Sequence, residues 1–159
     1  MKICLDEAAA AFRLDEVPVG ALVVSPDNHV IAKAHNLTIY KNSPLAHAET
    51  LVIDMASKVL GNFRLTGCTL FVSKEPCVMC AGAIVEARIK RVVFGCYDLK
   101  RGALGSMIDV NKLPLNHRFE VRGGVLEKDS YKILKDFFQI RRGTEVVITG
   151  PTRNRLYAL

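Results

Sequence analysis

The sequence predicts an α/β protein, a three-layer α/β/α domain built on a five-stranded mixed sheet. Two observations carry this prediction. Short runs rich in valine, leucine and isoleucine alternate with longer segments of helical periodicity, which is the pattern of strands joined by helices that cover both faces of a sheet. The first two apolar runs are separated only by turn residues, so they predict an antiparallel hairpin ahead of the parallel strands.

The first half of the domain is predicted to contain two helices with a two-stranded hairpin between them. A helix opens the chain, because its apolar residues follow i, i+3, i+4 spacing; it lacks a capping residue, which suggests a truncated or alternative start at Met1. Strands are expected over 19–24 and 30–34, on either side of the turn residues Pro26-Asp27-Asn28. A helix over 47–60 has apolar side chains at four-residue steps, Leu51, Met55 and Val59.

The second half continues the alternation. Strands are predicted over 69–73 and 91–95, with a helix from 77 to about 87 between them, and a glycine-containing polar loop over 96–107. The final strand is expected over 119–126, with Gly123-Gly124 marking a bulge or bend, and the final helix over 128–142.

Length and composition predict one domain over 1–142, followed by a tail, 143–159, of uncertain order. Val146, Val147 and Ile148 could add an edge strand, but Gly150-Pro151 and the terminal position favour a loose tail, in which Arg153 and Arg155 would add charge near a partner. No leader of the secretory type and no apolar run of about 18 residues is found, so a cytoplasmic protein without a membrane span is expected.

Charge and cysteine content narrow the expected partners and compartment. The net charge of +6, from 22 Lys+Arg against 16 Asp+Glu, favours a polyanionic partner such as nucleic acid. A basic but inert solvated surface remains the alternative on charge alone. Two of the five cysteines belong to a metal motif, and Cys4, Cys68 and Cys96 are expected as buried thiols in a reducing compartment.

Three metal-ligand candidates and one carboxylate lie between residues 43 and 91. Cys77 and Cys80 follow Pro76 at i, i+3 spacing and fall on one face of a helix's first turn if the proline opens that helix. Together with His47 they supply three ligands of the types that zinc prefers and leave a fourth position for water, as in catalytic zinc sites. Since His47 and Glu49 lie about 200° apart on a helix, we expect the metal between two helix N-termini.

Glu49 is the candidate general acid and base. Bound zinc lowers the pKa of its water from about 15.7 towards about 7, and a carboxylate beside it can move the water's proton to a ring nitrogen and then to a departing amine. The order H-x-E followed by P-C-x-x-C is the known signature of zinc-dependent nucleobase deaminases.

The chain resembles the bacterial tRNA-specific adenosine deaminase family over residues 1–142. The zinc motifs alone are shared with cytidine, guanine and riboflavin-pathway deaminases, so the flanking runs carry the substrate prediction. The resemblance implies a cytidine-deaminase-like fold, one Zn²⁺ per subunit, a homodimer, and conversion of adenosine to inosine at the wobble position of a tRNA anticodon stem-loop. It rests on these runs: Glu16-Val17-Pro18-Val19-Gly20, Ala46-His47-Ala48-Glu49, Glu75-Pro76-Cys77-Val78-Met79-Cys80-Ala81-Gly82-Ala83, Arg91-Val92-Val93-Phe94-Gly95, Gly105-Ser106 and Asn116-His117.

The same resemblance implies substrate contacts for four residues. Val17 and Asn36 would line the base pocket, with the asparagine hydrogen-bonded to the purine; the alternative is that Asn36 only closes a turn. Asp98 would approach a ribose hydroxyl next to the target nucleotide, with a solvated charged loop as the alternative. His117 would lie near RNA.

Two further RNA contacts are predicted from the residues themselves. In the last helix Phe138 and Arg142 belong to a segment in which aromatic and basic side chains converge, a mixture that suits stacking on unpaired bases and contact with phosphates. Core packing remains the expected place of at least one of the two neighbouring phenylalanine rings.

Two other functions stay open. One is a deaminase of a free base or nucleoside such as guanine or cytidine, which needs no RNA surface. The other is a non-catalytic RNA-binding or structural zinc protein; Glu49, which is no ligand and would have no role there, argues against it.

Overall fold

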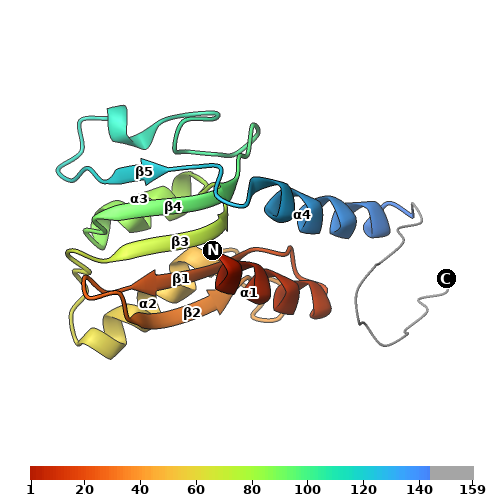
Figure 1. The fold of residues 1–159 in the computed structure, drawn as a ribbon, viewed down its shortest axis with the longest axis horizontal. Helices are drawn as coiled ribbons and strands as arrows, with labels where there is room; N and C mark the ends of the chain where they lie inside the picture. The colour runs from red at the N-terminus through yellow and green to blue at the C-terminus, as the bar shows by residue number, and fades with distance from the viewer. Residues whose placement is uncertain (144–159) are drawn as a thin grey trace.

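In the computed structural model, which describes residues 1–143, a five-stranded mixed sheet has the order β2-β1-β3-β4-β5 (Figure 1). Its strands are β1 (Gly20–Val24), β2 (Val30–His35), β3 (Thr69–Lys74), β4 (Arg91–Cys96) and β5 (Glu120–Arg122). β1 pairs antiparallel with both β2 and β3, whereas β3, β4 and β5 are parallel. The predicted hairpin and mixed sheet are confirmed.

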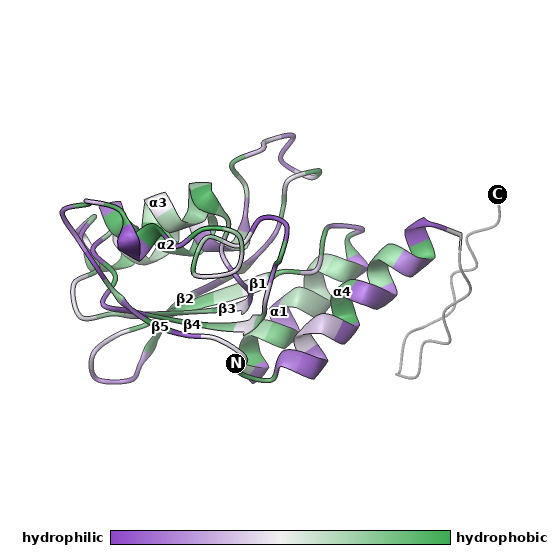
Figure 2. Ribbon diagram, turned by 90° about the horizontal axis from the view of Figure 1, so that it is seen from above, coloured by the Kyte–Doolittle hydropathy of each residue, from purple (hydrophilic) through white to green (hydrophobic). Residues whose placement is uncertain are grey.

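The helices are α1 (Lys2–Arg13), α2 (Ala48–Leu60), α3 (Val78–Glu86) and α4 (Glu127–Arg141), with a 3-10 turn, η1 (Val110–Lys112), before β5. Figure 2 shows α2 and α3 on one face of the sheet and α1 and α4 on the other. This arrangement confirms the three-layer α/β/α prediction. The parallel strands β3, β4 and β5 all end at the same edge, and α4 runs beyond that edge (Figure 1).

Two glycines let helices pack closely against the sheet. A Cβ atom on Gly20 would overlap the carbonyl oxygen of Cys4 in α1, and one on Gly95 would overlap both the Ser73 carbonyl oxygen and the Ser130 hydroxyl of α4. At both positions the added Cβ would overlap backbone atoms, which cannot rotate away as a side chain can. The thickness of the α1 and α4 layer therefore depends on these two positions.

One sequence prediction is corrected by the structure, and the apolar repeat noted in α2 does not mark its buried face. The final strand covers only Glu120–Arg122 and not 119–126, because the backbone turns after it: Gly124 and Leu126 have φ angles of +80° and +55°, outside the extended region of a regular strand. In α2, Met55 and Val59 are 44% and 67% exposed. The buried face of that helix is formed instead by Ala48, Glu49, Val52, Ile53 and Ala56.

The three thiols predicted to be buried are found buried in the structure of residues 1–143. Cys4, Cys68 and Cys96 are buried free thiols, and burial raises the pKa of Cys4 to about 12 and that of Cys96 to about 11. Among the described helices, none has the length and apolar character needed to cross a membrane. The proposed edge strand over 146–148, the Gly150-Pro151 turn, Arg153 and Arg155 lie outside the described residues.

Candidate active site

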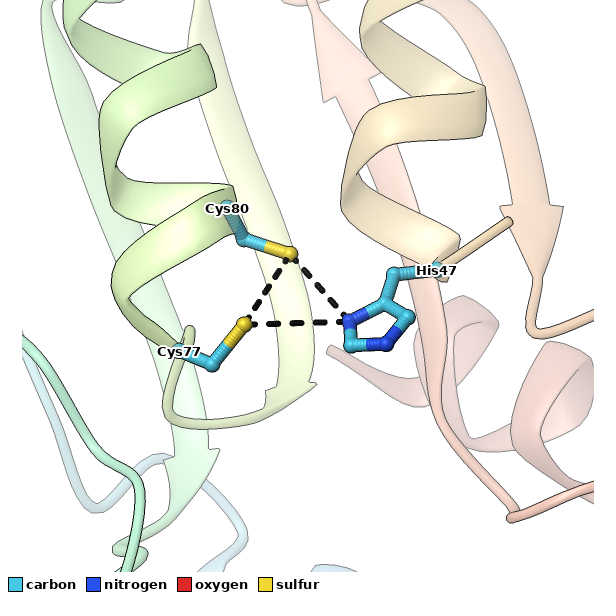
Figure 3. A group of neighbouring side chains, drawn as sticks. All are labelled: His47, Cys77 and Cys80. Carbon is cyan, nitrogen blue, oxygen red and sulfur yellow. Dashed lines mark hydrogen bonds between the residues drawn. The ribbon is translucent and has the colours of Figure 1, made fainter. Parts of the chain in front are cut away.

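His47, Cys77 and Cys80 point toward one another from the starts of two helices (Figure 3). His47 is the N-cap residue of α2, Cys77 is the N-cap residue of α3, and Cys80 lies in the first turn of α3. The Nδ1 atom of His47 lies 3.8 Å from the Cys77 sulfur and 3.5 Å from the Cys80 sulfur, and the two sulfurs are 3.7 Å apart. The group thus lies between two helix N-termini, as the spacing predicted.

These distances fit a tetrahedral zinc ion. Bond lengths of about 2.3 Å to sulfur and about 2.0–2.1 Å to nitrogen place tetrahedral ligands about 3.8 Å apart for two sulfurs and about 3.6 Å apart for sulfur and nitrogen. The observed triangle matches both values. Among the residues described, this is the group of His, Cys and acidic side chains able to hold a metal, and three protein ligands leave one position for water.

The electrostatics of the group favour a thiolate at Cys77. The hydrogen bond from the Cys80 thiol and the neighbouring His47 lower the pKa of Cys77 to about 3, and the positive end of α3 acts in the same direction. The hydrogen bond to the Cys77 sulfur, together with burial, raises the pKa of Cys80. One sulfur is therefore ready to ligate a metal, while the second must release a proton when a metal binds.

Glu49 lies one residue beyond the start of α2 and is 4% exposed. Burial raises the pKa of its carboxyl group above the usual range. A carboxyl group with a raised pKa exchanges protons more readily near neutral pH than an exposed one does. Glu49 is not among the three side chains that converge on the metal position, so it is available as a proton carrier.

Asn36 connects the predicted base pocket to the metal-binding helix. Its Nδ2 atom donates a hydrogen bond to the Val17 carbonyl oxygen at 3.1 Å, and its Oδ1 atom accepts one from the Ala48 amide at 2.8 Å. Val17 and Asn36 are thus held together directly beside His47. These two hydrogen bonds fix the orientation of the Asn36 amide, and the contact of both residues with a purine stays a prediction.

A second carboxylate, Glu75, organises the loop over 96–107. Glu75 is 2% exposed and accepts hydrogen bonds from the backbone amides of Asp98 at 3.0 Å, Leu104 at 3.0 Å and Ser106 at 3.1 Å. Because Glu75 precedes Pro76 and Cys77, this loop is attached to the metal-binding segment. This role of Glu75 was not predicted from the sequence, although a charged residue between a buried strand and a proline was a usable signal.

Asp98 is engaged within that loop. Its carboxylate forms an ion pair with Lys74 and accepts the backbone amides of Lys100 at 3.1 Å and Arg101 at 3.2 Å. These partners outweigh the effect of partial burial and lower the pKa of Asp98. The structure thus gives Asp98 a role in shaping the loop, and its predicted ribose contact stays a prediction.

The two neighbouring phenylalanine rings near the end of α4 differ in exposure. Phe137 is 3% exposed and packs edge-on against Phe12 of α1, with ring centroids 5.4 Å apart. Phe138 is 41% exposed, and Arg142 follows it on the surface at the C-cap of α4. One ring therefore belongs to the core, as expected, and the other is open to a partner.

His117 does not join the other predicted site residues. Its Nε2 atom lies 2.7 Å from the Ile89 carbonyl oxygen, next to the residues that begin β4 and β5. The metal group lies past the opposite ends of the parallel strands, where β3 leads into α3. The RNA contact implied for His117 stays a prediction, and its position at the far end of the sheet does not favour it.

Comparison with known proteins agrees with this geometry. The family model of the MafB19-like deaminases matches residues 1–142. The tRNA-specific adenosine deaminase of Bacillus subtilis is 46% identical over 140 residues, covering 87% of this chain and 86% of that protein. The corresponding protein of Haemophilus influenzae is 43% identical over 143 residues, covering 89% of this chain and 83% of that protein.

Solved structures give the same picture. A structure from a study of A-to-I editing by tRNA:A34 deaminases aligns with a TM-score of 0.80 at 44% identity, covering 84% of this chain and 97% of that chain. The guanine deaminase of Nitrosomonas europaea aligns with a TM-score of 0.72 at 25% identity, covering 86% of this chain and 81% of that chain. With its metal-ligand geometry and these matches, the chain belongs to the MafB19-like deaminases and, among them, to the tRNA-specific adenosine deaminase family.

Proposed function

We propose that this protein deaminates adenosine to inosine hydrolytically at the wobble position of tRNA, using one zinc ion per subunit. The observation that carries the proposal is the His47, Cys77 and Cys80 triangle, with its tetrahedral spacing, beside the buried Glu49. The similarity to tRNA-specific adenosine deaminases supports adenosine in tRNA as the substrate.

The catalytic roles follow from the positions of the side chains. Zinc held by the three ligands would supply a Lewis acid that lowers the pKa of a coordinated water towards about 7. Burial raises the pKa of Glu49, so its carboxyl group would both accept and donate a proton during the reaction. It would take a proton from water and deliver it to the purine ring and then to the leaving amine. Val17 and Asn36 would orient the purine, and the products would be inosine and ammonia.

An unpaired anticodon loop suits this site. The target base must leave its stack to reach the metal, at a cost of a few kcal/mol that is smaller for an unpaired base than for one in a duplex. Phe138 and Arg142, exposed at the end of α4, would add a stacking surface and a phosphate contact. We therefore place the anticodon stem-loop across the sheet edge at which β3, β4 and β5 end.

The test of substrate class is inosine formation in purified tRNA, read by sequencing, with free adenosine, cytidine and guanine assayed for ammonia alongside. Inosine confined to the first anticodon position supports the proposal. Ammonia from a free base or nucleoside, with no inosine in tRNA, supports the second candidate, which the similarity to a guanine deaminase favours. In that case Arg142→Glu should leave activity unchanged, whereas a tRNA enzyme should show weaker binding and a shallower salt dependence.

Glu49→Ala tests the mechanism independently of the substrate class. The variant should retain zinc, since Glu49 is no ligand, but its kcat should fall by about 10²- to 10⁴-fold, the usual contribution of a general acid–base group. Glu86→Ala, which removes an exposed carboxylate from the far end of α3, should change neither zinc content nor kcat. Unchanged turnover in Glu49→Ala would remove this residue from the mechanism.

We also propose a cytoplasmic homodimer. Exposed apolar side chains on α2 and the turn after it, Met55, Val59 and Phe63, support a protein interface on that side of the domain. A sedimentation experiment that finds only monomer at micromolar concentration would contradict this part of the proposal.

A further inference from the structure

Glu16 is a buried carboxylate that the proposed mechanism does not use. It is 0% exposed and lies in the run Glu16-Val17-Pro18-Val19-Gly20 between α1 and β1. Its Oε1 atom accepts the backbone amides of Ile39 at 2.7 Å and Tyr40 at 2.8 Å, and its Oε2 atom accepts the Thr38 hydroxyl at 2.8 Å. A carboxylate is buried at a large cost in solvation unless donors replace the lost water, and these three donors do so.

All three donors belong to one loop, residues 37–46, which lies beside the metal group. The Leu37 amide donates to the Ala46 carbonyl oxygen at 3.0 Å and closes the loop at its base. Asn36, which accepts a hydrogen bond from the first amide of α2, directly precedes the loop, and His47 directly follows it. A shift of the outer part of this loop would therefore change the surface that substrate meets at the entrance to the site.

The outer surface of the loop has the features of a contact surface. Ile39, Tyr40 and Leu45 are 60%, 79% and 63% exposed. A hollow of about 360 Å³ is lined by loop residues 38, 39 and 42–44. Exposed apolar and aromatic side chains next to a base-flipping site are suited to stack on unpaired nucleotides. The backbone amides of two of these residues, Ile39 and Tyr40, are the groups that Glu16 holds.

The segment that carries Glu16 is itself anchored. Asp15 has a left-handed backbone with φ of +62°, and Arg141 of α4 binds both its carboxylate, at 2.8 Å, and its carbonyl oxygen, at 2.7 Å. Arg141 also lies over the Phe137 ring, 5.0 Å from its centroid. The loop is thus tied through Glu16 to the packed layer of α1 and α4.

We propose that Glu16 is a positioning residue for tRNA binding, which fixes loop 37–46 in the shape that presents Ile39 and Tyr40 to the nucleotides flanking the target adenosine. This inference rests on the proposed function. Because the side-chain hydrogen bonds of Glu16 described for residues 1–143 all go to the loop, and none goes to the metal-ligand candidates or Glu49, its loss should weaken tRNA binding and leave the chemical step and the metal site intact.

The experiment compares four variants with the wild type: Glu16→Ala, Glu16→Gln, Thr38→Val and Asn111→Ala. Glutamine can still present an oxygen to both backbone amides, so it should rescue the loop. Thr38→Val removes one hydrogen-bond donor to the buried carboxylate but keeps Glu16 itself, and so reports on the loop if Glu16→Ala fails to fold. Asn111 is the matched control, because its side chain also holds backbone by hydrogen bonds but lies at the far end of the sheet. It donates to the Phe119 carbonyl oxygen at 2.8 Å and accepts the Phe119 amide at 3.3 Å.

Three readouts decide the matter: hydrogen exchange of the Ile39 and Tyr40 amides in the free protein, zinc content, and KM and kcat on tRNA. Glu16→Ala should speed exchange at both amides, keep one zinc, and raise KM about tenfold or more with kcat within about twofold, the signature of lost binding interactions. Glu16→Gln should recover most of the affinity, Thr38→Val should show a smaller rise in KM, and Asn111→Ala should show none.

Two results would overturn the inference. One is unchanged exchange at Ile39 and Tyr40 in Glu16→Ala, and the other is a fall in kcat with KM unchanged. Failure of the proposed function is seen separately, as a wild-type enzyme that forms no inosine in tRNA; the tRNA role of Glu16 then falls with it, while the exchange measurement still decides whether Glu16 holds the loop.

Discussion

At the scale of single residues, Glu7 forms the charged connection between the first helix and the edge of the sheet. Its carboxylate lies 2.8 Å from the Lys33 ammonium and 2.8 Å from Nδ1 of His35, both on β2. Burial alone raises the pKa of Glu7, but the hydrogen bonds and charges of Lys33 and His35 outweigh burial, so the pKa falls below its usual value of 4.5. Folding therefore favours the ionised form of this residue.

The lowered pKa predicts a pH dependence of stability. A carboxyl group whose pKa is lower in the folded state stabilises the protein above the unfolded pKa, and this contribution is lost as the pH falls through the folded pKa. Glu7→Gln should therefore destabilise the protein by about 1 kcal/mol at pH 7, and the difference should shrink below pH 4.5. Urea unfolding of both proteins at pH 7 and pH 3.5 measures it.

Asp54→Asn is the matched control for this measurement. The Asp54 and Lys58 pair on α2 has a similar separation, 2.6 Å, but its side chains are 59% and 74% exposed. Exposed pairs of this kind contribute little to stability. A pH dependence as large for Asp54→Asn as for Glu7→Gln would show that general charge repulsion, and not the Glu7 contacts, is the cause.

At the scale of helices and strands, the contact between α4 and β4 leaves no room for a side chain at Gly95. Gly95→Ala should destabilise the protein by about 1–3 kcal/mol, because the new methyl group must displace backbone as well as the Ser130 hydroxyl. Adding Ser130→Gly should not restore stability, since the Ser73 carbonyl oxygen remains in the way. Gly82→Ala on α3, where nothing lies within 4 Å, should not destabilise. Thermal unfolding of the three variants checks these outcomes.

The elements also show what local sequence determines. Apart from the extent of the final strand, strand and helix positions followed from periodicity, and the candidate metal ligands were proposed from their spacing, because both depend on residues close together in the chain. The buried face of α2 was not evident, since alanines and Glu49, and not the larger Met55 and Val59, face the sheet. A helix that packs closely on a sheet takes small residues at the contact and leaves large ones outside.

Glu16 and Glu75 were missed for a different reason. Each carboxylate finds its hydrogen-bond donors on a loop that lies between 22 and 31 residues further along the chain, a separation that periodicity cannot reveal. His117 shows the same limit, because only the parallel pairing of β4 with β5 places it at the end of the sheet opposite the metal group. Local spacing identified the chemistry, and tertiary contacts determined what supports it.

At the scale of the whole molecule, the described residues 1–143 form one continuous buried apolar cluster among themselves. The buried apolar cluster extends from Val19 to Leu134 and includes residues from both sides of the sheet. A protein ending at Gly143 should therefore keep its melting temperature within a few degrees, its secondary structure and one bound zinc. Circular dichroism and zinc analysis test this, and loss of cooperative unfolding would contradict a single domain over 1–142.

The pair of sulfurs in the metal group has a consequence for the behaviour of the protein under oxidising conditions. Cys77 and Cys80 lie 3.7 Å apart, and hydrogen bonding keeps one of them as a thiolate and the other as a thiol. That is also the arrangement from which an oxidant closes a disulfide between neighbouring cysteines. Disulfide formation and zinc binding therefore compete for the same two sulfur atoms. The zinc ion that would serve catalysis would also protect these sulfurs from oxidation.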